Sequence, residues 1–494
     1  MGTLELPGCF AMTETGHGSN VQDVETLATF DAGEQGFVVS TPHSGARKDY
    51  IGNAGRDGRM ATVFAQLVVG GERHGVHALL VPIRDGEGRP LPGVTIEDCG
   101  EKLGLNGVDN GRLGFDGVRI PRENLLDRFG QVSADGRYDS AIASPSKRFF
   151  TMLGTLVGGR LSVTLAAVSA AKLALTIAVR YGARRRQFGP EGGPETPILD
   201  YSSHQRRLLP RLAATYAFHF AGQHLVAGFL ASQPDDRREL EGEVAGLKAL
   251  ASWHATATVQ ECREACGGQG YLAENRLAAL KADSDIFTTF EGDNTVLLQL
   301  LAKSLLTGYR KQFGALHWPG VVRYLAEKAG TAIAELNPVV TRWVDDDHLR
   351  SRDFLLGAFA WRASHQLASL ARRIKKRLDQ KMEPLAAVNE CQDHLLAAAR
   401  SHVEHRMAER FAEAVQTCPE PALAAALGRL FQLFALSRLE ADRGWFLEHG
   451  YFEAGKAKAI GKQVTKLCRE LRPDAVALVD AFGVPAACLP PIAR

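Results

Sequence analysis

The chain has 494 residues, which suggests several domains and is ample for building hydrophobic cores. Hydrophobic residues make up 45% and charged residues 23% of it, an ordinary composition that excludes disordered and fibrous proteins. Lys and Arg number 58 against 56 Asp and Glu, and this balance argues against nucleic acid as a partner.

The sequence shows no obvious targeting or membrane segment. Eight cysteines are too few for a disulfide framework, which indicates a reducing compartment. No secretory signal opens the chain and no Ser-Lys-Leu type signal closes it, so we expect a cytoplasmic location. The most apolar stretch, Leu161–Val179, contains Lys172 and is therefore expected to be a buried helix rather than a membrane span.

The first part of the chain, between residues 24 and 120, has the pattern of β-strands. Short runs rich in Val, Phe and Leu, such as Gly36–Ser40, Ala61–Val69 and His77–Pro82, are separated by Gly, Asp and Pro. The segment Gly130–Lys147, with its Ser, Asp, Gly and Pro, is expected to be a linker.

From about Phe149 onward the periodicity is helical, with long stretches rich in Ala, Leu, Arg and Glu. A turn at residues 317–320 separates a first set of helices from a second. The sequence thus predicts an α+β, mostly α fold with a small β-barrel-like domain followed by two α-helical bundles. The expected domains are residues 1–140, 148–310 and 320–494.

The loop Met12–Asn20 alternates glycines with hydroxyl and amide side chains just before the first expected strand. Such a loop can offer backbone N–H groups and hydroxyls to an anion or to the polar edge of a ring. The alternative is an ordinary surface loop.

A second glycine-rich segment, Cys266–Tyr271, follows a long helical stretch and contains Gly267 and Gly268. A glycine just past a helix end is a common helix terminator. Three glycines in four positions exceed what a terminator requires, so close approach of the backbone to a ligand is the second interpretation.

The segment Thr288–Thr295 precedes an apolar helical run, and Asp293, Asn294 or Thr295 can cap that helix. Glu291 stands beside Phe290 in this segment. A carboxylate among apolar neighbours has its charged form disfavoured, which suits a general base working near neutral pH. A solvated glutamate in a turn is the alternative.

Three other clusters are weaker candidates for a functional site. The run Arg184–Gly189 can hold phosphate, or its cations can simply complement a helix C-terminus. Cys262 and Cys266 have no partners at ligand spacing, so no metal is expected. His402 and His405, on a charged helix, are expected to be solvated.

Four motifs stand in order along the chain and cover about residues 8–310: Cys9–Asn20, Ala46–Ala54, Cys266–Tyr271 and Thr289–Asn294. Taken together, their order and spacing resemble the acyl-CoA oxidases of the acyl-CoA dehydrogenase superfamily. The remaining residues fit the additional C-terminal helical domain of the oxidases.

This resemblance implies an enzyme with FAD as cofactor that oxidises acyl-CoA to trans-2-enoyl-CoA, with O2 as acceptor and H2O2 as product, in fatty-acid β-oxidation. Glu291 occupies the position of the catalytic base. Thr13 and Gly52 match positions that contact FAD, and Ser19 matches one at the edge between flavin and substrate.

The resemblance also implies a homodimer. Arg185 and Phe188 match an element that in relatives reaches the FAD of a partner subunit, and Gly267 and Gly268 match a loop along the FAD pyrophosphate. Two alternatives stay open: a dehydrogenase that passes electrons to a flavoprotein, and a non-catalytic remnant. The second arises because members carry an N-terminal helical domain that we expect this chain to lack.

Overall fold

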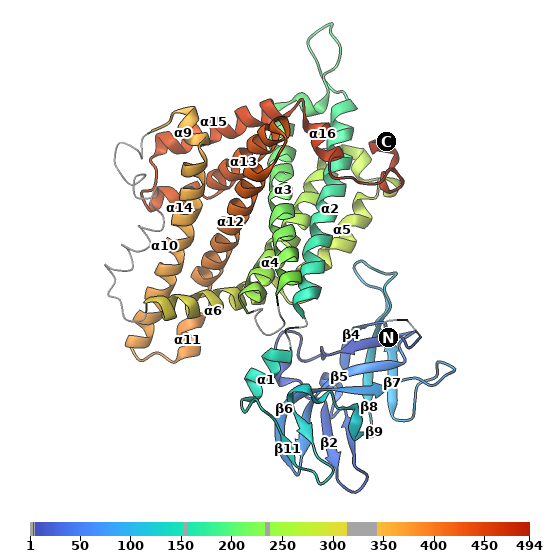
Figure 1. The fold of residues 1–494 in the computed structure, drawn as a ribbon. Helices are drawn as coiled ribbons and strands as arrows, with labels where there is room; N and C mark the ends of the chain where they lie inside the picture. The colour runs from blue at the N-terminus through green and yellow to red at the C-terminus, as the bar shows by residue number, and fades with distance from the viewer. Residues whose placement is uncertain (1–2, 4, 153, 155, 233–237, 314–342) are drawn as a thin grey trace. The chain divides into compact units, whose positions relative to one another are not determined.

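The computed structural model describes residues 3, 5–152, 154, 156–232, 238–313 and 343–494. These residues form two compact units, Met1–Leu156 and Val157–Arg494, drawn from blue to teal and from teal to red in Figure 1. The expected turn at residues 317–320 lies outside the described residues.

The first unit is built from β-sheet. Its six-stranded sheet has the order β1-β5-β2-β3-β9, with β6 on the other edge of β5, and a second sheet has the order β4-β8-β7. The strands are β1 Gly8–Ala11, β2 Leu27–Asp31, β3 Gly36–Ser40, β4 Lys48–Gly52, β5 Met60–Val69, β6 Glu72–Pro82, β7 Val94–Asp98, β8 Asn110–Phe115 and β9 Val118–Pro121.

Alternation of buried and exposed residues explains why these segments are strands. In β8 every second residue is buried, because successive residues in a strand face opposite sides of the sheet. The buried set includes Phe37, Val63, Leu79 and Leu113, which pack into one core. The predicted β-domain is therefore confirmed.

The expected linker is structured instead. It contains a hairpin of two short strands, β10 Gln131–Val132 and β11 Tyr138–Asp139, and the start of helix α1, Pro145–Met152. Tyr138 stacks on His74 and its hydroxyl lies 3.1 Å from Nε2 of His77. The polar composition suggested a linker, but cross-strand packing orders the segment.

The second unit is entirely helical where it is described. Its longer helices are α2 Leu156–Arg184, α3 Ser202–Ala231, α4 Arg238–Ala265, α6 Asn294–Phe313, α10 Arg352–Asp379, α12 Gln392–Thr417, α13 Pro421–Ala441 and α15 Ala454–Leu471. Shorter helices are α5 Leu277–Asp285, α9 Asp346–Arg350, α11 Pro384–Asn389, α14 Arg443–Glu448 and α16 Ala475–Asp480.

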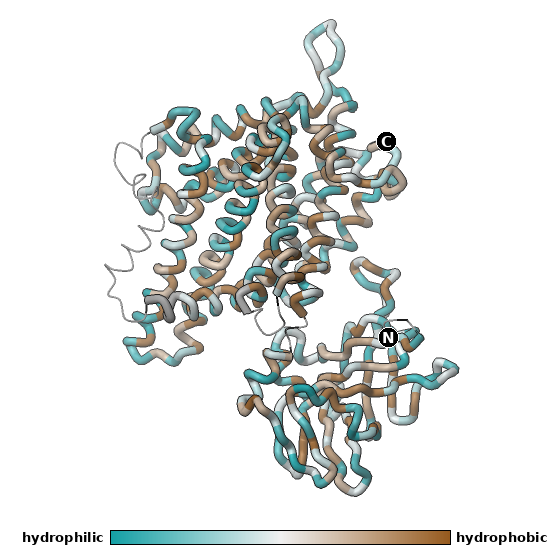
Figure 2. The backbone as a smooth tube through the Cα atoms, in the orientation of Figure 1, coloured by the Kyte–Doolittle hydropathy of each residue, from teal (hydrophilic) through white to brown (hydrophobic). Residues whose placement is uncertain are grey.

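One continuous hydrophobic core joins the two sets of helices, with α12 packing against α3 and α6 as well as α10. Hydrophobic and hydrophilic residues alternate along these helices in Figure 2, which is the pattern expected of amphipathic bundle helices. A mostly helical α+β fold is thus confirmed.

Two described helices, α2 and α13, are long and apolar enough to cross a membrane by length and composition alone. In α2, 67% of the apolar window is buried inside the protein. A core helix of a globular unit shows this burial, as we predicted for Leu161–Val179.

Candidate functional site

Glu291 lies in a tightly held turn between α5 and α6. Its φ of 55° and the φ of 108° at Gly292 place two consecutive residues at positive φ. Positive φ is unfavourable for a non-glycine residue, so this conformation persists only where the surrounding structure enforces it. Nε of Arg160 donates to the Glu291 carbonyl at 3.2 Å, and Nζ of Lys248 donates to the Gly292 carbonyl at 2.7 Å.

The start of α6 fixes the other side of this turn. Of the three candidate caps, Asp293 is the one that caps, since its carboxylate accepts from the N–H groups of Thr295 and Val296 at 2.8 and 3.2 Å. Asn294 is buried instead and donates to Oγ of Ser252 at 2.9 Å. The turn is therefore anchored to α4 and to α6.

The carboxylate of Glu291 is half-buried, and its Oε2 atom is buried without a hydrogen-bond partner among the described residues. Burial raises the pKa of Glu291, although the charges of Arg160 and Lys248 oppose this. A Cβ added at Gly159 would lie 2.7 Å from Oε2, so this glycine leaves the room that the carboxylate occupies. A desolvated carboxylate with a free oxygen is suited to accept a proton.

The loop with Thr13 is anchored by Glu14, a buried carboxylate. Nζ of Lys48 lies 2.9 Å from Oε1, and the N–H groups of Glu25 and Thr26 donate to the carboxylate at 2.7 and 2.9 Å. Burial would raise the pKa of Glu14, but Lys48 and these hydrogen bonds outweigh it and hold the pKa below its ordinary value. Glu14 is thus a structural carboxylate and is not suited to be a base.

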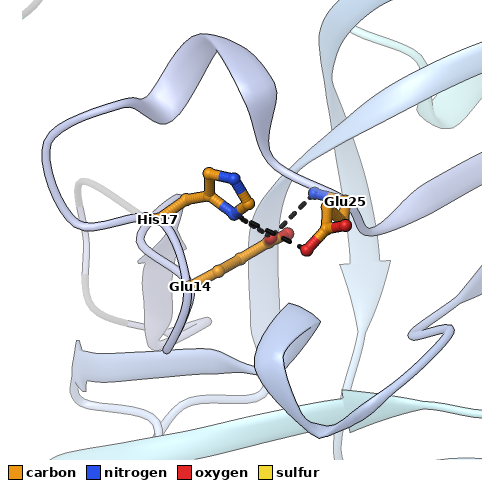
Figure 3. A group of neighbouring side chains, drawn as sticks. All are labelled: Glu14, His17 and Glu25. Carbon is orange, nitrogen blue, oxygen red and sulfur yellow. Dashed lines mark hydrogen bonds and ion pairs between the residues drawn. The ribbon is translucent and has the colours of Figure 1, made fainter.

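Figure 3 shows Glu14 together with His17 and Glu25, a group that could in principle hold a metal ion. Nδ1 of His17 lies 3.7 Å from an oxygen of each glutamate, which is too long for a hydrogen bond. Because both oxygens of Glu14 already accept hydrogen bonds, the group fits an anchor for the loop better than a metal centre.

Thr13 and Gly52 are brought to the same strand. The Thr13 carbonyl accepts from the N–H of Asp49 near the start of β4, and Gly52 ends that strand. A Cβ added at Gly52 would meet no described atom within 4 Å, so its backbone is open to a ligand. Ser19 lies farther along the loop and is exposed.

Arg185 and Phe188 lie in the loop that follows α2, which projects from the bundle in Figure 1. Arg185 is exposed, and Phe188 is 77% exposed with a φ of 56°. A bulky residue at positive φ is uncommon and persists where the surrounding loop enforces it.

Gly267 and Gly268 follow the end of α4. Gly267 has a φ of 56° and so terminates the helix, as the first interpretation predicted. Gly270 is required for packing, because a Cβ there would lie 2.0 Å from the carbonyl of Arg263. Neither Gly267 nor Gly268 would bring a Cβ near any described atom, so their backbone is open as well.

The helical unit therefore carries two groups of candidate residues at opposite ends. Arg207, near the start of α3, pairs with Glu261, near the end of α4, so the loop after α2 and the turn after α4 share one end. The helical rise places Arg185 about 37 Å along α2 from Arg160. Glu291 contacts Arg160 and thus lies at the other end.

Sequence reasoning missed Gly159, Arg160 and Lys248. A signal for the first was present, since two adjacent glycines inside a helix weaken it and need a reason. Lys248 stands alone in an Ala- and Leu-rich stretch, which gave no hint of its partner. The prediction that His402 and His405 are solvated is wrong, because both side chains are only partly exposed, and burial lowers the pKa of each, to about 4 for His402.

Comparison with known proteins first gives the class: residues 9–118 match the middle domain of acyl-CoA dehydrogenases. Residues 153–306 match the acyl-CoA oxidase C-alpha1 domain, and residues 351–490 match the acyl-CoA oxidase model. The chain belongs to the acyl-CoA oxidase family.

Individual relatives agree with this assignment. The chain is 47% identical over 493 residues to acyl-coenzyme A oxidase 2, peroxisomal, of Arabidopsis thaliana, covering 98% of this chain and 71% of that protein. The crystal structure of acyl-CoA oxidase 1 from Yarrowia lipolytica superposes with a TM-score of 0.90 at 32% identity, over 99% of this chain and 72% of that one. Acyl-CoA oxidase-2 of Caenorhabditis elegans, bound with FAD, ascaroside-CoA and ATP, has a TM-score of 0.86 at 29% identity, over 99% and 73%.

The resemblance, the enzyme class and the FAD cofactor are thereby confirmed at the level of the family. The cytoplasmic location is wrong, since the Arabidopsis relative and others are named peroxisomal. The cytoplasmic expectation rested on the lack of a recognised targeting signal. Targeting signals are short motifs that a receptor binds, so the fold does not indicate them. The roles of the single residues and the homodimer stay predictions.

Proposed function

We propose that this protein oxidises acyl-CoA thioesters to trans-2-enoyl-CoA, with FAD as cofactor and O2 as the final acceptor, which leaves as H2O2. The observation that carries this proposal is the half-buried Glu291, with one free oxygen and a raised pKa, in a turn held by two cations. Bound FAD supplies the acceptor for the two electrons and the hydrogen that leave the β-carbon.

Glu291 takes the proton from the α-carbon of the thioester onto its carboxylate. An α-proton beside a thioester is weakly acidic, so the base must hold a proton near neutral pH and must be shielded from water. Burial of the carboxylate provides both conditions. The strained turn keeps the carboxylate in one place, which favours a reactive geometry.

Thr13 and Gly52 are proposed to contact FAD, and Ser19 to lie at the edge of flavin and substrate. The Thr13 hydroxyl has no hydrogen-bond partner among the described side chains and is partly exposed. The open backbone of Gly52 allows a close approach. Glu14 and Lys48 hold this loop in place without blocking it.

Arg185, Phe188, Gly267 and Gly268 are proposed to contact the FAD of a partner subunit in a homodimer. They share one end of the helical unit, and Glu291 lies at the other end. A separation of about 37 Å along α2 is longer than an extended dinucleotide, so both groups cannot act on one cofactor within a single subunit. A two-fold dimer satisfies both groups at once.

Peroxide release tests the activity. The purified, FAD-loaded protein is given acyl-CoA thioesters in air, and H2O2 and enoyl-CoA are measured in parallel. Equal amounts of both products support the oxidase. Turnover only with an added electron-transfer flavoprotein supports the dehydrogenase, and the absence of flavin absorbance with no turnover supports the non-catalytic remnant.

A further inference from the structure

Lys248 is a fully buried cation inside the helical unit. It lies on α4, with 0% of its side chain exposed. Its ammonium donates to the Gly292 carbonyl at 2.7 Å and to Oδ1 of Asn294 at 3.1 Å. Neither of these partners is a carboxylate.

Burying a charged group without a carboxylate as hydrogen-bond partner costs free energy. A lysine buried in this way therefore indicates that the structure requires its hydrogen bonds or its charge. Both partners of Lys248 belong to the turn that carries Glu291. The carbonyl of Glu291 itself accepts from Arg160, so two cations from two helices converge on two consecutive peptide groups. An ordinary helix start does not need such an arrangement, because Asp293 already caps α6.

We propose that Lys248 is a positioning residue for Glu291: through the Gly292 carbonyl it holds the turn in which Glu291 has positive φ. This inference rests on the function proposed above. Lys248 does not touch the reacting atoms and acts through Glu291.

The charges around this turn define the direction of the effect. Burial lowers the pKa of Lys248 to about 8. The negative charges of Asp293 and Glu291 act in the opposite direction, and the positive charge of Arg160 acts in the same direction as burial. Arg160 itself pairs with a carboxylate, since its Nη1 atom lies 3.6 Å from Oε1 of Glu241. Below pH 8 the ammonium is charged and opposes the rise in the pKa of Glu291 that burial causes. Removing it therefore raises the pKa of Glu291 further.

Three variants separate the positioning hydrogen bond of Lys248 from its charge. Lys248→Met removes the hydrogen bond and the charge. Lys248→Gln keeps a hydrogen-bond donor without the charge, and Lys248→Arg keeps the charge. The matched control is Lys456→Met, a lysine of α15 that is equally buried but packs on Phe354.

The first measurement is anaerobic stopped-flow bleaching of the flavin by acyl-CoA in the loaded protein, as a function of pH. In Lys248→Met we expect the rate at saturating substrate to fall about 10- to 100-fold, as for a misplaced catalytic group, with a change in Kd below about threefold. The acid limb should move to higher pH in both neutral variants and stay near that of the parent in Lys248→Arg.

The second measurement needs no turnover. Difference infrared titration, with Glu291→Gln as the reference, follows the carboxyl stretch of Glu291, and its midpoint should move up in Lys248→Met and Lys248→Gln. An unmoved midpoint in both, or an equal shift in Lys456→Met, overturns the inference. A parent that is not bleached by any acyl-CoA instead overturns the proposed function, so the two failures are distinguishable.

Discussion

At the scale of single residues, the turn at Glu291 combines strain, burial and charge. Glu291 and Gly292 both have positive φ, and cations from α2 and α4 bind their carbonyl groups. The cations compensate the strain of the turn, while burial keeps one carboxylate oxygen unpaired. Small changes at these positions should therefore affect chemistry more than stability.

Replacing Glu291 with Gln should lower the rate of flavin bleaching by acyl-CoA at least about 10²- to 10⁴-fold, because a general base contributes roughly that factor. The amide keeps the size of the side chain, so acyl-CoA should still bind. Anaerobic stopped-flow absorbance measures the rate, and substrate titration measures binding. Fast bleaching by this variant would exclude Glu291 as the base.

Replacing Gly159 with Ala should also slow bleaching, because the new Cβ would lie 2.7 Å from Oε2 of Glu291 and displace the carboxylate. We expect a loss on the order of 10²-fold, as for a displacement of about 1 Å. Gly158→Ala is the matched control, since its Cβ would meet only Phe229 at an ordinary 3.5 Å. If both variants react like the parent, Gly159 does not make room for the base.

The pH dependence of bleaching follows from the raised pKa of Glu291. The proton acceptor is the ionised form, so the rate should fall as the pH drops through this pKa, at a higher pH than an ordinary glutamate would give. The rate measured against pH in the parent checks this. A rate that stays constant down to the ordinary range near pH 4 would contradict it.

At the scale of elements, helix ends carry the candidate site. Asp293 caps the start of α6 and so determines where the turn stops, and Gly267 follows the end of α4 and leaves a backbone open to a ligand. The loop with Thr13 depends in the same way on a buried ion pair, between Glu14 and Lys48.

Removing the cap with Asp293→Ala should lower the free energy of unfolding by about 1 kcal/mol, the usual contribution of such a cap. Asp293→Ser retains a capping oxygen and should cost only a fraction of this. Urea denaturation followed by circular dichroism compares the three proteins. Equal losses in both variants would mean that the cap is not what stabilises the start of α6.

At the scale of the whole molecule, we propose that a complete site takes residues from two chains. Glu291 lies at one end, and Arg185 and Gly268 lie at the other. In a two-fold dimer each subunit supplies one group to each of two identical sites.

Mixing two inactive variants tests this arrangement. Coexpression of Glu291→Gln with Arg185→Ala should restore activity, because half of the dimers are mixed and each mixed dimer has one intact site. This corresponds to about a quarter of the parent activity per chain, by the symmetry of the dimer. Each variant expressed alone is the control, and no gain on mixing would show that both groups act within one subunit.

The sequence by itself determined the succession of a strand-rich part and a helical part, because the period of apolar residues depends only on neighbours along the chain. It also determined the family, since the order of short motifs such as Cys266–Tyr271 can be read without coordinates. The position of Glu291 as the candidate base came from the same motif order.

Only the tertiary structure decided which groups meet. It selected Asp293 as the cap among three candidates, brought Gly159, Arg160 and Lys248 to the turn that carries Glu291, and covered most of His402. These contacts join residues of different helices, and the charge and burial of a side chain depend on what packs against it. A local pattern contains no information about such partners, so the chemistry of the site appears only once the helices are packed.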